Sequence, residues 1–290
     1  MSKVLDDLLQ YLSLEKIEEG LFRGQSQNLG FGRVFGGQVI GQALSAAKET
    51  VEGRSVHSFH SYFLRPGDDQ KPIVYEVEKI RDGRSFCTRR VSAIQYGKPI
   101  FYLTASFQTE EEGYDHSPGM PNVPGPEGLV SEHDFFQKNI DKIPKHLREI
   151  IAGEKPIEIR HVQVTDPFNP KKMPAQRQVW IKANGSLPDD MRIHRYLLAY
   201  ASDFNFLPTA LFPHGRSHIL KDMQVATLDH SMWFHRNFRM DEWILFDMDS
   251  TSASGGRGLV KGQFFNQQGE LVASAMQEGV IRDYQAFPKA

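Results

Sequence analysis

The segment MQVATLDHSMWFHR (223–236) brings a threonine, an aspartate, a serine and two histidines close together in the chain. Such side chains could hold a metal ion, form a nucleophile with its base, or serve a β-strand through local hydrogen bonds. His230 and His235 are five residues apart, and an odd spacing on a strand sends side chains to opposite faces. Without a bulge they do not chelate one ion, and the chain has neither an HExxH motif nor a pair of cysteines. We therefore expect no metal site.

A nucleophilic mechanism also lacks its usual sequence context. Ser231 lies in DHSMW, which is not the GxSxG pattern of a nucleophile elbow. Cys87 is the only cysteine, and its setting, SFCTRR, is that of a small core residue on a strand. The glycine-rich stretch SASGGRG (252–258) lacks the GxxxxGK[ST] pattern and precedes a strand, so a hairpin loop is favoured over an anion site built from backbone amides.

Two polar residues stand out against apolar surroundings. Asp203 lies in LLAYASDFNFLP, where we expect a buried helix face, and Gln277 lies late in the apolar strand LVASAMQEGVI. A buried carboxylate needs partners or a raised pKa. Asp203 could cap a helix end and Gln277 could be a satisfied core amide. Together with Thr227 they could instead converge on one water, with the carboxylate as general base and the amide and hydroxyl orienting the water.

Strict alternation along 223–236 places Thr227, Asp229 and Ser231 on one face of a strand and His230 on the other, mostly apolar face. Around this segment, the pattern predicts helices over 4–18, after the glycines of 33–50, over 131–153 and over 191–206. It predicts strands over 56–68, 72–83, 85–111, 156–164, 176–185, 223–243 and 256–283, and the four prolines and four glycines of 113–130 indicate a linker.

The order of elements suggests an internal duplication. HSYFL (60–64) aligns with HSMWF (230–234) at an offset of 170, and IQYGKPI (94–100) aligns with NQQGELV (266–272) at an offset of 172. We therefore expect an α+β fold of two units, each with one long helix buried against an antiparallel sheet. The predicted organisation is an N-terminal unit over 1–115, a linker over 116–157 and a C-terminal unit over 158–290 that carries the candidate catalytic residues.

Composition narrows the class of protein. Apolar residues make up 40% and charged residues 24% of the 290 residues, and the formal net charge is −2, which gives no support to nucleic-acid binding through bulk charge. No apolar run is long enough to span a bilayer, so no membrane span is expected. The single cysteine and the acidic start, without a signal pattern, favour a cytoplasmic location.

Blocks distributed over nearly the whole chain resemble those of the type II acyl-CoA thioesterases, the bacterial TesB family. These blocks are GLFRGQS, VFGGQV, VHSFHSYFLRPGD, RQVWIKANG, YASDFNFLP, ATLDHSMWFHR, STSAS and VASAMQEGV. The resemblance implies a double hotdog fold and hydrolysis of acyl-CoA substrates of broad chain length to CoA and fatty acid. It also implies that Asp203, Thr227 and Gln277 activate a water, with no metal, no cofactor and no acyl-enzyme, in a homo-oligomer (a dimer or tetramer).

The oxyanion of such a reaction needs N–H donors, and a helix N-terminus can supply them. Gly36 and Gly37, which precede the first long helix, are the candidates because glycine lets a backbone approach closely. Two alternatives stay open. One is a hydratase or dehydratase acting on acyl thioesters, with His57 or His60 and an acid. The other is a module that binds acyl-CoA without turnover.

Overall fold

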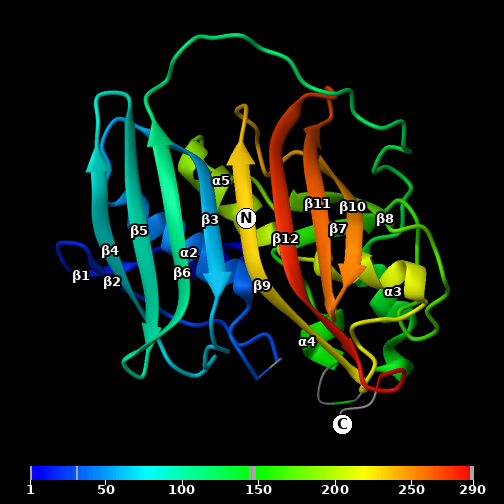
Figure 1. Ribbon diagram of the computed structural model, residues 1–290. Helices are drawn as coiled ribbons and strands as arrows, with labels where there is room; N and C mark the ends of the chain where they lie inside the picture. Colours follow the sequence, from blue (N-terminus) through cyan, green and yellow to red (C-terminus); the bar gives the residue numbers. More distant parts are fainter. Residues whose placement is uncertain (1, 31, 144, 146–147, 288–290) are drawn as a thin grey trace.

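One continuous antiparallel sheet of twelve strands organises the computed structural model (Figure 1), which describes residues 2–30, 32–143, 145 and 148–287. The strand order is β1-β2-β4-β5-β6-β3-β9-β12-β11-β10-β8-β7. The strands of the first half are β1 (Glu15–Glu18), β2 (Leu21–Gly24), β3 (Ser55–Phe63), β4 (Ile73–Asp82), β5 (Phe86–Gln95) and β6 (Lys98–Gln108). Those of the second half are β7 (Ile157–His161), β8 (Gln176–Ala183), β9 (Met223–Phe234), β10 (Ile244–Ser254), β11 (Arg257–Asn266) and β12 (Leu271–Asp283).

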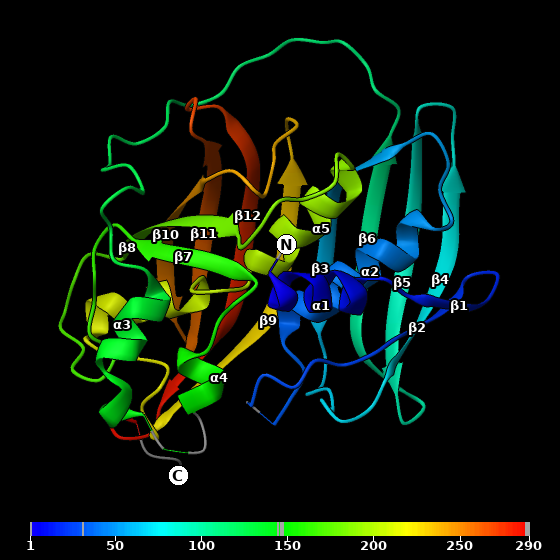
Figure 2. The ribbon, with the colours of Figure 1, turned by 180° about the vertical axis from the view of Figure 1, so that it is seen from behind.

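The helices lie behind the sheet in the view of Figure 1 and in front of it in Figure 2. They are α1 (Lys3–Leu12), α2 (Gly36–Lys48), α3 (Glu132–Lys138), α4 (Arg148–Ala152) and α5 (Met191–Ala201), with the 3-10 segments η1 (Ile140–Lys142) and η3 (Leu207–His214). No helix among the described residues is long and apolar enough to cross a membrane.

The two halves repeat one plan. In the first half the order outward from the centre is β3-β6-β5-β4-β2-β1, and in the second it is β9-β12-β11-β10-β8-β7. The halves meet where β3 pairs antiparallel with β9. This is the double hotdog, α+β architecture that the resemblance implies. The division into units at 1–115, 116–157 and 158–290 stays a prediction, although the long connection after β6 runs over the top of the sheet toward α3 (Figure 1).

The strand register corrects the alignment of the two halves. β3 pairs with β6 as Phe59↔Ala105, whereas β9 pairs with β12 as His230↔Gln277. Phe59 therefore occupies in the first half the place that His230 occupies in the second, and the offset for these strands is 171 rather than 170. The offset of 170 follows from the identical His-Ser pairs at 60–61 and 230–231. The strand pairing instead shows which residues face the core, and these are offset by 171.

Several predicted elements are confirmed and others were wrong. The helix predicted after the glycines of 33–50 is α2, which begins at Gly36 and so includes these glycines. The helix predicted over 4–18 ends at Leu12 and is followed by the β1–β2 hairpin. The helix predicted over 191–206 ends at Ala201, and the 3-10 segment η3 follows it. The sequence patterns also missed β10, which pairs with β8 and β11.

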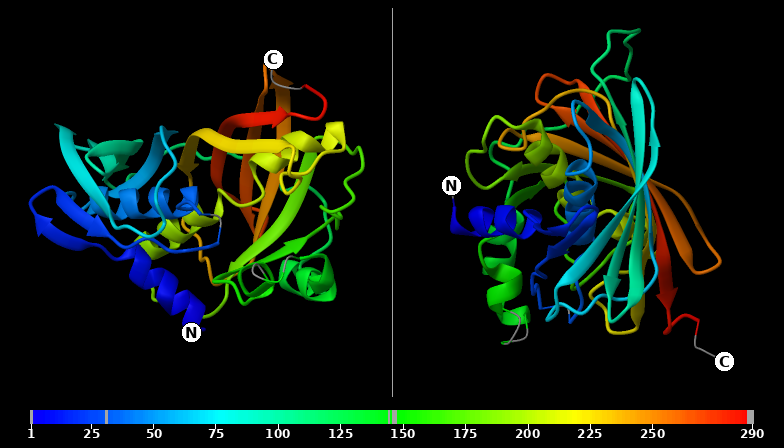
Figure 3. Two further views of the ribbon diagram at one scale, coloured as in Figure 1. Left: turned by 90° about the horizontal axis from the view of Figure 1, so that it is seen from below. Right: turned by 90° about the vertical axis from the view of Figure 1, so that its left-hand side faces the viewer.

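The helices of the two halves do not pack alike. Helix α2 is buried along most of its length and lies across β2–β6, as each hotdog helix is expected to do. Helix α5 instead packs mainly on α2, while η3 covers strands β8–β12 of its own half. The view from below in Figure 3 shows α2 and α5 side by side, with α2 against the strands of the first half. The contact between these two helices therefore joins the halves behind the β3–β9 pair.

Glycine makes that helix contact possible. A Cβ atom placed on Gly37 would lie 2.2 Å from the backbone oxygen of Tyr200, near the end of α5. No real Cβ atom approaches a backbone atom so closely, so a side chain here would force the two helices apart.

We expect Gly37→Ala to lower the free energy of unfolding by about 1–3 kcal/mol, the usual cost of overpacking a close contact. Denaturant unfolding measures this change. Gly113→Ala is the matched control, because a Cβ atom there would meet no atom within 4 Å. Equal stability of the two variants would show that the helix contact relaxes without cost.

Candidate active site

Asp203 lies at a break between two helical segments, not on the helix face that the sequence suggested. Helix α5 ends at Ala201, and Asn205 adopts a left-handed backbone conformation with φ of 60° before η3 begins. The half-buried guanidinium of Arg177 donates to the backbone oxygen of Asn205 at 3.2 Å and to its side-chain oxygen at 2.8 Å. This clamp fixes the turn, so the Asp203 carboxylate projects from the end of α5 toward the N-terminus of α2.

A β-bulge brings Thr227 onto the same face of the sheet as Gln277. β9 and β12 pair as Glu278↔Asp229 and then as Gly279↔Thr227, so Leu228 has no partner. The extra residue shifts the alternation by one position. The prediction that Thr227 faces away from His230 was therefore wrong, because strict alternation does not hold across a bulge.

The carboxylate of Asp203 is the point at which these residues meet. Its Oδ1 accepts a hydrogen bond from Nε2 of Gln277 at 2.6 Å and a longer one from Oγ1 of Thr227 at 3.4 Å. Its Oδ2 accepts from the backbone N–H of Gly37 at 3.1 Å. The structure thus brings together all three residues proposed to activate a water, from two strands and a helix end, and adds the start of α2.

The distances suggest unequal roles. The contact between Gln277 and Asp203 is short, as expected for a donor to an ionised carboxylate. The contact from Thr227 exceeds the normal range for an O–H···O bond, so its hydroxyl is held loosely and is free to contact another group. Gln277 is fully buried, whereas Asp203 and Thr227 each keep part of their surface exposed. A small molecule therefore meets the acid and the hydroxyl before it meets the amide.

Burial raises the pKa of Asp203, since the charged form loses its hydration. The hydrogen bonds from Gln277, Gly37 and Thr227, together with the positive charge of Arg33, act in the opposite direction. A carboxylate with a raised pKa is a stronger base than an ordinary surface aspartate and suits proton transfer from water.

The glycines proposed as oxyanion donors contact the acid in this structure. The Gly37 amide donates to Asp203, and a Cβ atom on Gly36 would lie 2.6 Å from the same carboxylate oxygen. Asp203 thus caps α2 from another part of the chain, which fits a helix whose own N-cap residue, Phe35, provides no side-chain cap. The assignment of Gly36 and Gly37 to the oxyanion stays a prediction.

The other candidate groups have local partners. His57 bonds the hydroxyl of Ser106 at 2.8 Å, and His60 bonds that of Ser231 at 3.1 Å. Cys87 is buried, and burial raises the pKa of its thiol, which disfavours the reactive thiolate. Among the residues that the structure describes, no group of three or more His, Cys, Asp or Glu side chains is placed to hold a metal ion.

Two further polar residues lie next to Asp203, Thr227 and Gln277 and complete a polar cluster with them. They are His230 and Ser202, which sequence reasoning missed and which are both fully buried. His230 Nδ1 lies 3.1 Å from Nε2 of Gln277, and its Nε2 lies 3.0 Å from the hydroxyl of Ser202. Burial lowers the pKa of His230 to about 3, so its ring is neutral. The sequence contains one signal, because His230 alternates with the apolar residues Leu228, Met232 and Phe234 along its strand.

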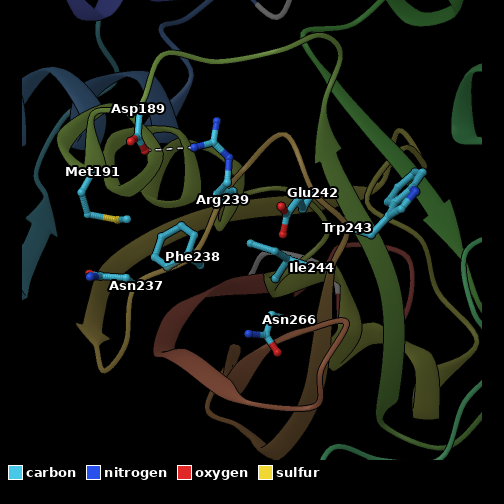
Figure 4. Close-up of a pocket in the computed structure, with 9 residues that line it drawn as sticks. All are labelled: Asp189, Met191, Asn237, Phe238, Arg239, Glu242, Trp243, Ile244 and Asn266. Atoms are coloured by element: carbon cyan, nitrogen blue, oxygen red, sulfur yellow. Dashed lines mark hydrogen bonds and ion pairs between the residues drawn. The ribbon is translucent and has the colours of Figure 1, made fainter.

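An open pocket of about 280 Å³ lies elsewhere in the second half (Figure 4). Its lining residues are Asp189, Met191, Asn237, Phe238, Arg239, Glu242, Trp243, Ile244 and Asn266. Two of these residues, Arg239 and Asp189, form an ion pair at 3.1 Å. None of Asp203, Thr227 and Gln277 contributes to this pocket, so the polar cluster and the pocket are separate features.

Comparisons with known proteins agree with this architecture. A family model described as the N-terminal domain of acyl-CoA thioesterase matches residues 25–108, and one described as acyl-CoA thioesterase matches residues 146–280. The chain is 49% identical to "Acyl-CoA thioesterase 2" of Haemophilus influenzae, across 97% of this chain and 99% of that protein. It is 43% identical to human "Acyl-coenzyme A thioesterase 8", across 93% of this chain and 87% of that protein.

A solved structure gives the same result. The crystal structure of acyl-CoA thioesterase II TesB2 from Mycobacterium marinum matches with a TM-score of 0.79 and 41% identity, covering 97% of this chain and 100% of that one.

The raised pKa of Asp203 predicts how it affects stability. The folded protein binds this proton more tightly than the unfolded chain, whose carboxyl has a pKa of about 3.9. The stability from Asp203 is therefore fully present below that pH and is lost as the pH rises through the folded-state pKa. We expect wild type to lose stability relative to Asp203→Asn as the pH rises above the unfolded-state pKa and through the raised folded-state pKa, as measured by denaturant unfolding.

Asp190→Asn is the control with the opposite sign. A hydrogen bond from Arg192 lowers the pKa of Asp190, so that carboxylate contributes stability that is lost as the pH falls. Equal slopes for the two variants would contradict the raised pKa of Asp203.

Proposed function

The chain belongs to the acyl-CoA thioesterase family, and from this membership we infer that it hydrolyses acyl-CoA thioesters to a fatty acid and free CoA. The proposed reaction is the direct attack of a water on the thioester carbonyl, with Asp203 as general base. The observation that carries the proposal is the convergence of Gln277, Thr227 and the Gly37 amide on one partly exposed carboxylate whose pKa burial raises.

Each group has a role in the proposed step. Asp203 accepts a proton from the water as the oxygen attacks the carbonyl carbon, and the tetrahedral intermediate then expels the CoA thiolate. Thr227, whose hydroxyl is loosely held, orients the water on the exposed side of the carboxylate. Gln277 donates to Asp203 from the buried side and fixes the direction of its lone pairs. A thiolate is a good leaving group, so a modest site suffices.

The proposed oxyanion donors are the first-turn amides of α2, with Gly36 and Gly37 as candidates. Gly37 donates to Asp203 in the absence of substrate. The Gly37 amide would therefore have to be shared between the acid and the developing oxyanion. Gly36 also lies beside this carboxylate, at the start of the helix. Both positions would stabilise negative charge through the helix N-terminus.

The proposal places one site in each chain, in the second half. In the first half, register puts Val56, Phe59 and Ala105 where the second half has Thr227, His230 and Gln277. The two halves even share the bulge, since β3 and β6 skip His57 as β9 and β12 skip Leu228. The first half thus keeps the backbone geometry but has apolar side chains at the corresponding positions.

The proposal extends to a broad range of acyl chain lengths, a cytoplasmic location and a homo-oligomer, a dimer or tetramer. The face of the sheet opposite the helices supports the oligomer. There the central strands expose large side chains, with exposed fractions of 61% for Tyr62, 39% for Tyr102 and 37% for Met276. Such a row of exposed aromatic and apolar groups is typical of a contact surface.

Asp203→Asn keeps the shape of the side chain and removes its basicity. We expect the release of free thiol from saturated acyl-CoA to fall by roughly 10²-fold or more, the scale of general-base catalysis. Asp229→Asn is the matched control. Asp229, on β9, is a partly buried carboxylate like Asp203, but it accepts a hydrogen bond from the backbone N–H of Glu278 and does not contact the polar cluster. Near wild-type turnover by folded Asp203→Asn would refute the mechanism.

The same assay separates the alternative activities. A hydratase or dehydratase would leave saturated acyl-CoA unchanged, because that substrate has neither a double bond to hydrate nor a hydroxyl group to eliminate. A binding module would retain acyl-CoA without turnover.

Direct attack by water leaves no acyl group on the protein. Mass spectrometry of reactions quenched during turnover should show only the unmodified chain. A stoichiometric acyl adduct on Thr227, Ser231 or Cys87 would instead require a covalent route.

A further inference from the structure

A buried chain of hydrogen bonds continues from Asp203 into the core. Gln277 Nε2 lies 2.6 Å from Asp203 Oδ1 and 3.1 Å from His230 Nδ1. His230 Nε2 lies 3.0 Å from the hydroxyl of Ser202, and that hydroxyl donates to the backbone oxygen of Ala199 at 2.8 Å. Gln277, His230 and Ser202 are all fully buried.

The direction of each hydrogen bond follows from its inner end. The backbone oxygen of Ala199 can only accept, so the Ser202 proton points to it, and the Ser202 oxygen is left to accept from His230. The ring therefore carries its proton on Nε2, and Nδ1 presents a lone pair toward Gln277. The Phe59 and Phe206 rings flank His230 at 5.9 and 5.7 Å between centroids. They supply no competing polar group.

This tautomer decides which way the Gln277 amide points. Its nitrogen faces two acceptors, the Asp203 carboxylate and the His230 lone pair, and each requires an N–H. Rotating the amide by half a turn would place its oxygen against both. The other tautomer of His230 would donate to the amide and favour that rotated state, in which Asp203 would lose its short hydrogen bond.

The hydrogen bonds that orient the Gln277 amide are made by its nitrogen and not by its oxygen. Gln277 Oε1 is buried and has no hydrogen-bond partner among the described residues. An unsatisfied buried oxygen is costly, so the two contacts on the nitrogen must outweigh it. The orientation is therefore set by acceptors on the nitrogen side and not by satisfaction of the whole group.

We infer that His230, held as its Nε2–H tautomer by Ser202, is a positioning residue that keeps the Gln277 amide nitrogen directed at Asp203. The inference rests on the proposed function, because it assigns a role to His230 only if Asp203 is the base. It goes further by tracing the orientation of the groups around that base to two core side chains that do not hydrogen-bond to the carboxylate.

His230→Phe tests the inference with a side chain that the fold already accepts, since Phe59 stands at the equivalent position in the first half. The variant keeps a ring of similar shape and removes the acceptor. We expect kcat to fall by roughly tenfold, the scale of one hydrogen bond to a charged group, with KM changed far less.

The pH profile gives a readout that a merely structural role would not change. Loss of the Gln277 hydrogen bond removes a factor that lowers the pKa of Asp203, so the acid limb of kcat/KM should move to higher pH. The other charged or titratable groups near the carboxylate, Arg33 before α2 and Tyr200 on α5, are unaltered in the variant. His230 itself stays neutral in this range.

Two further variants keep the test decisive if His230→Phe folds poorly. His230→Asn retains an acceptor near the position of Nδ1 and should recover part of kcat and of the acid limb. Ser202→Ala frees the tautomer and should shift the acid limb in the same direction as His230→Phe, by a smaller amount. Met232→Leu, a fully buried neighbour on β9 outside the chain of hydrogen bonds, is the control for packing and should leave the profile unchanged.

The outcomes distinguish the inference from the proposed function. If Asp203→Asn is inactive while folded His230→Phe keeps the wild-type kcat and acid limb, only the role of His230 is refuted. If all four variants lose activity in proportion to their loss of stability, the effect is structural and the inference also fails. If Asp203→Asn is fully active, the proposed mechanism itself fails.

Discussion

The pairing of β3 with β9 is the contact on which the rest of the structure depends. It joins two similar halves into one sheet and brings α2 of the first half against α5 of the second. At the end of α5, a carboxylate meets the N-terminus of α2, where the helix dipole and the Gly37 amide stabilise negative charge. The candidate site is therefore a product of the fusion, because neither half alone contains both the acid and the helix end that receives it.

That arrangement explains why glycine occupies the start of α2. A side chain on Gly37 would collide with the backbone of α5, and one on Gly36 would collide with the Asp203 carboxylate. The same closeness allows the carboxylate to replace a missing N-cap, since Phe35 offers no hydrogen-bonding side chain. Structural and chemical demands on Asp203 thus coincide, and its charge serves both the helix and the proposed reaction.

The sequence predicted the residue types of the site and most of the strands, but it did not predict how the residues come together. Asp203 and Gln277 were recognisable because a polar residue in an apolar stretch requires a reason. The turn that aims Asp203 depends on a left-handed Asn205 held by Arg177 from a distant strand. The position of Thr227 depends on one unpaired residue in β9. Both features are long-range pairings, and a local pattern of helix or strand periodicity contains no information about them.

The difference between the halves indicates how the polar cluster affects the stability of the fold. At equivalent positions the first half has Val56, Phe59 and Ala105, which fill the core without demanding partners. The second half has a threonine, a histidine and a glutamine there, and leaves one amide oxygen without a partner among the described residues. A buried neutral histidine and a carboxylate with a raised pKa both lower stability relative to apolar groups. A fold that already supplies a well-packed apolar version of the same positions would retain the costlier set in one half only where its chemistry is used. The apolar half then provides the rigid scaffold and the helix end against which that chemistry is set.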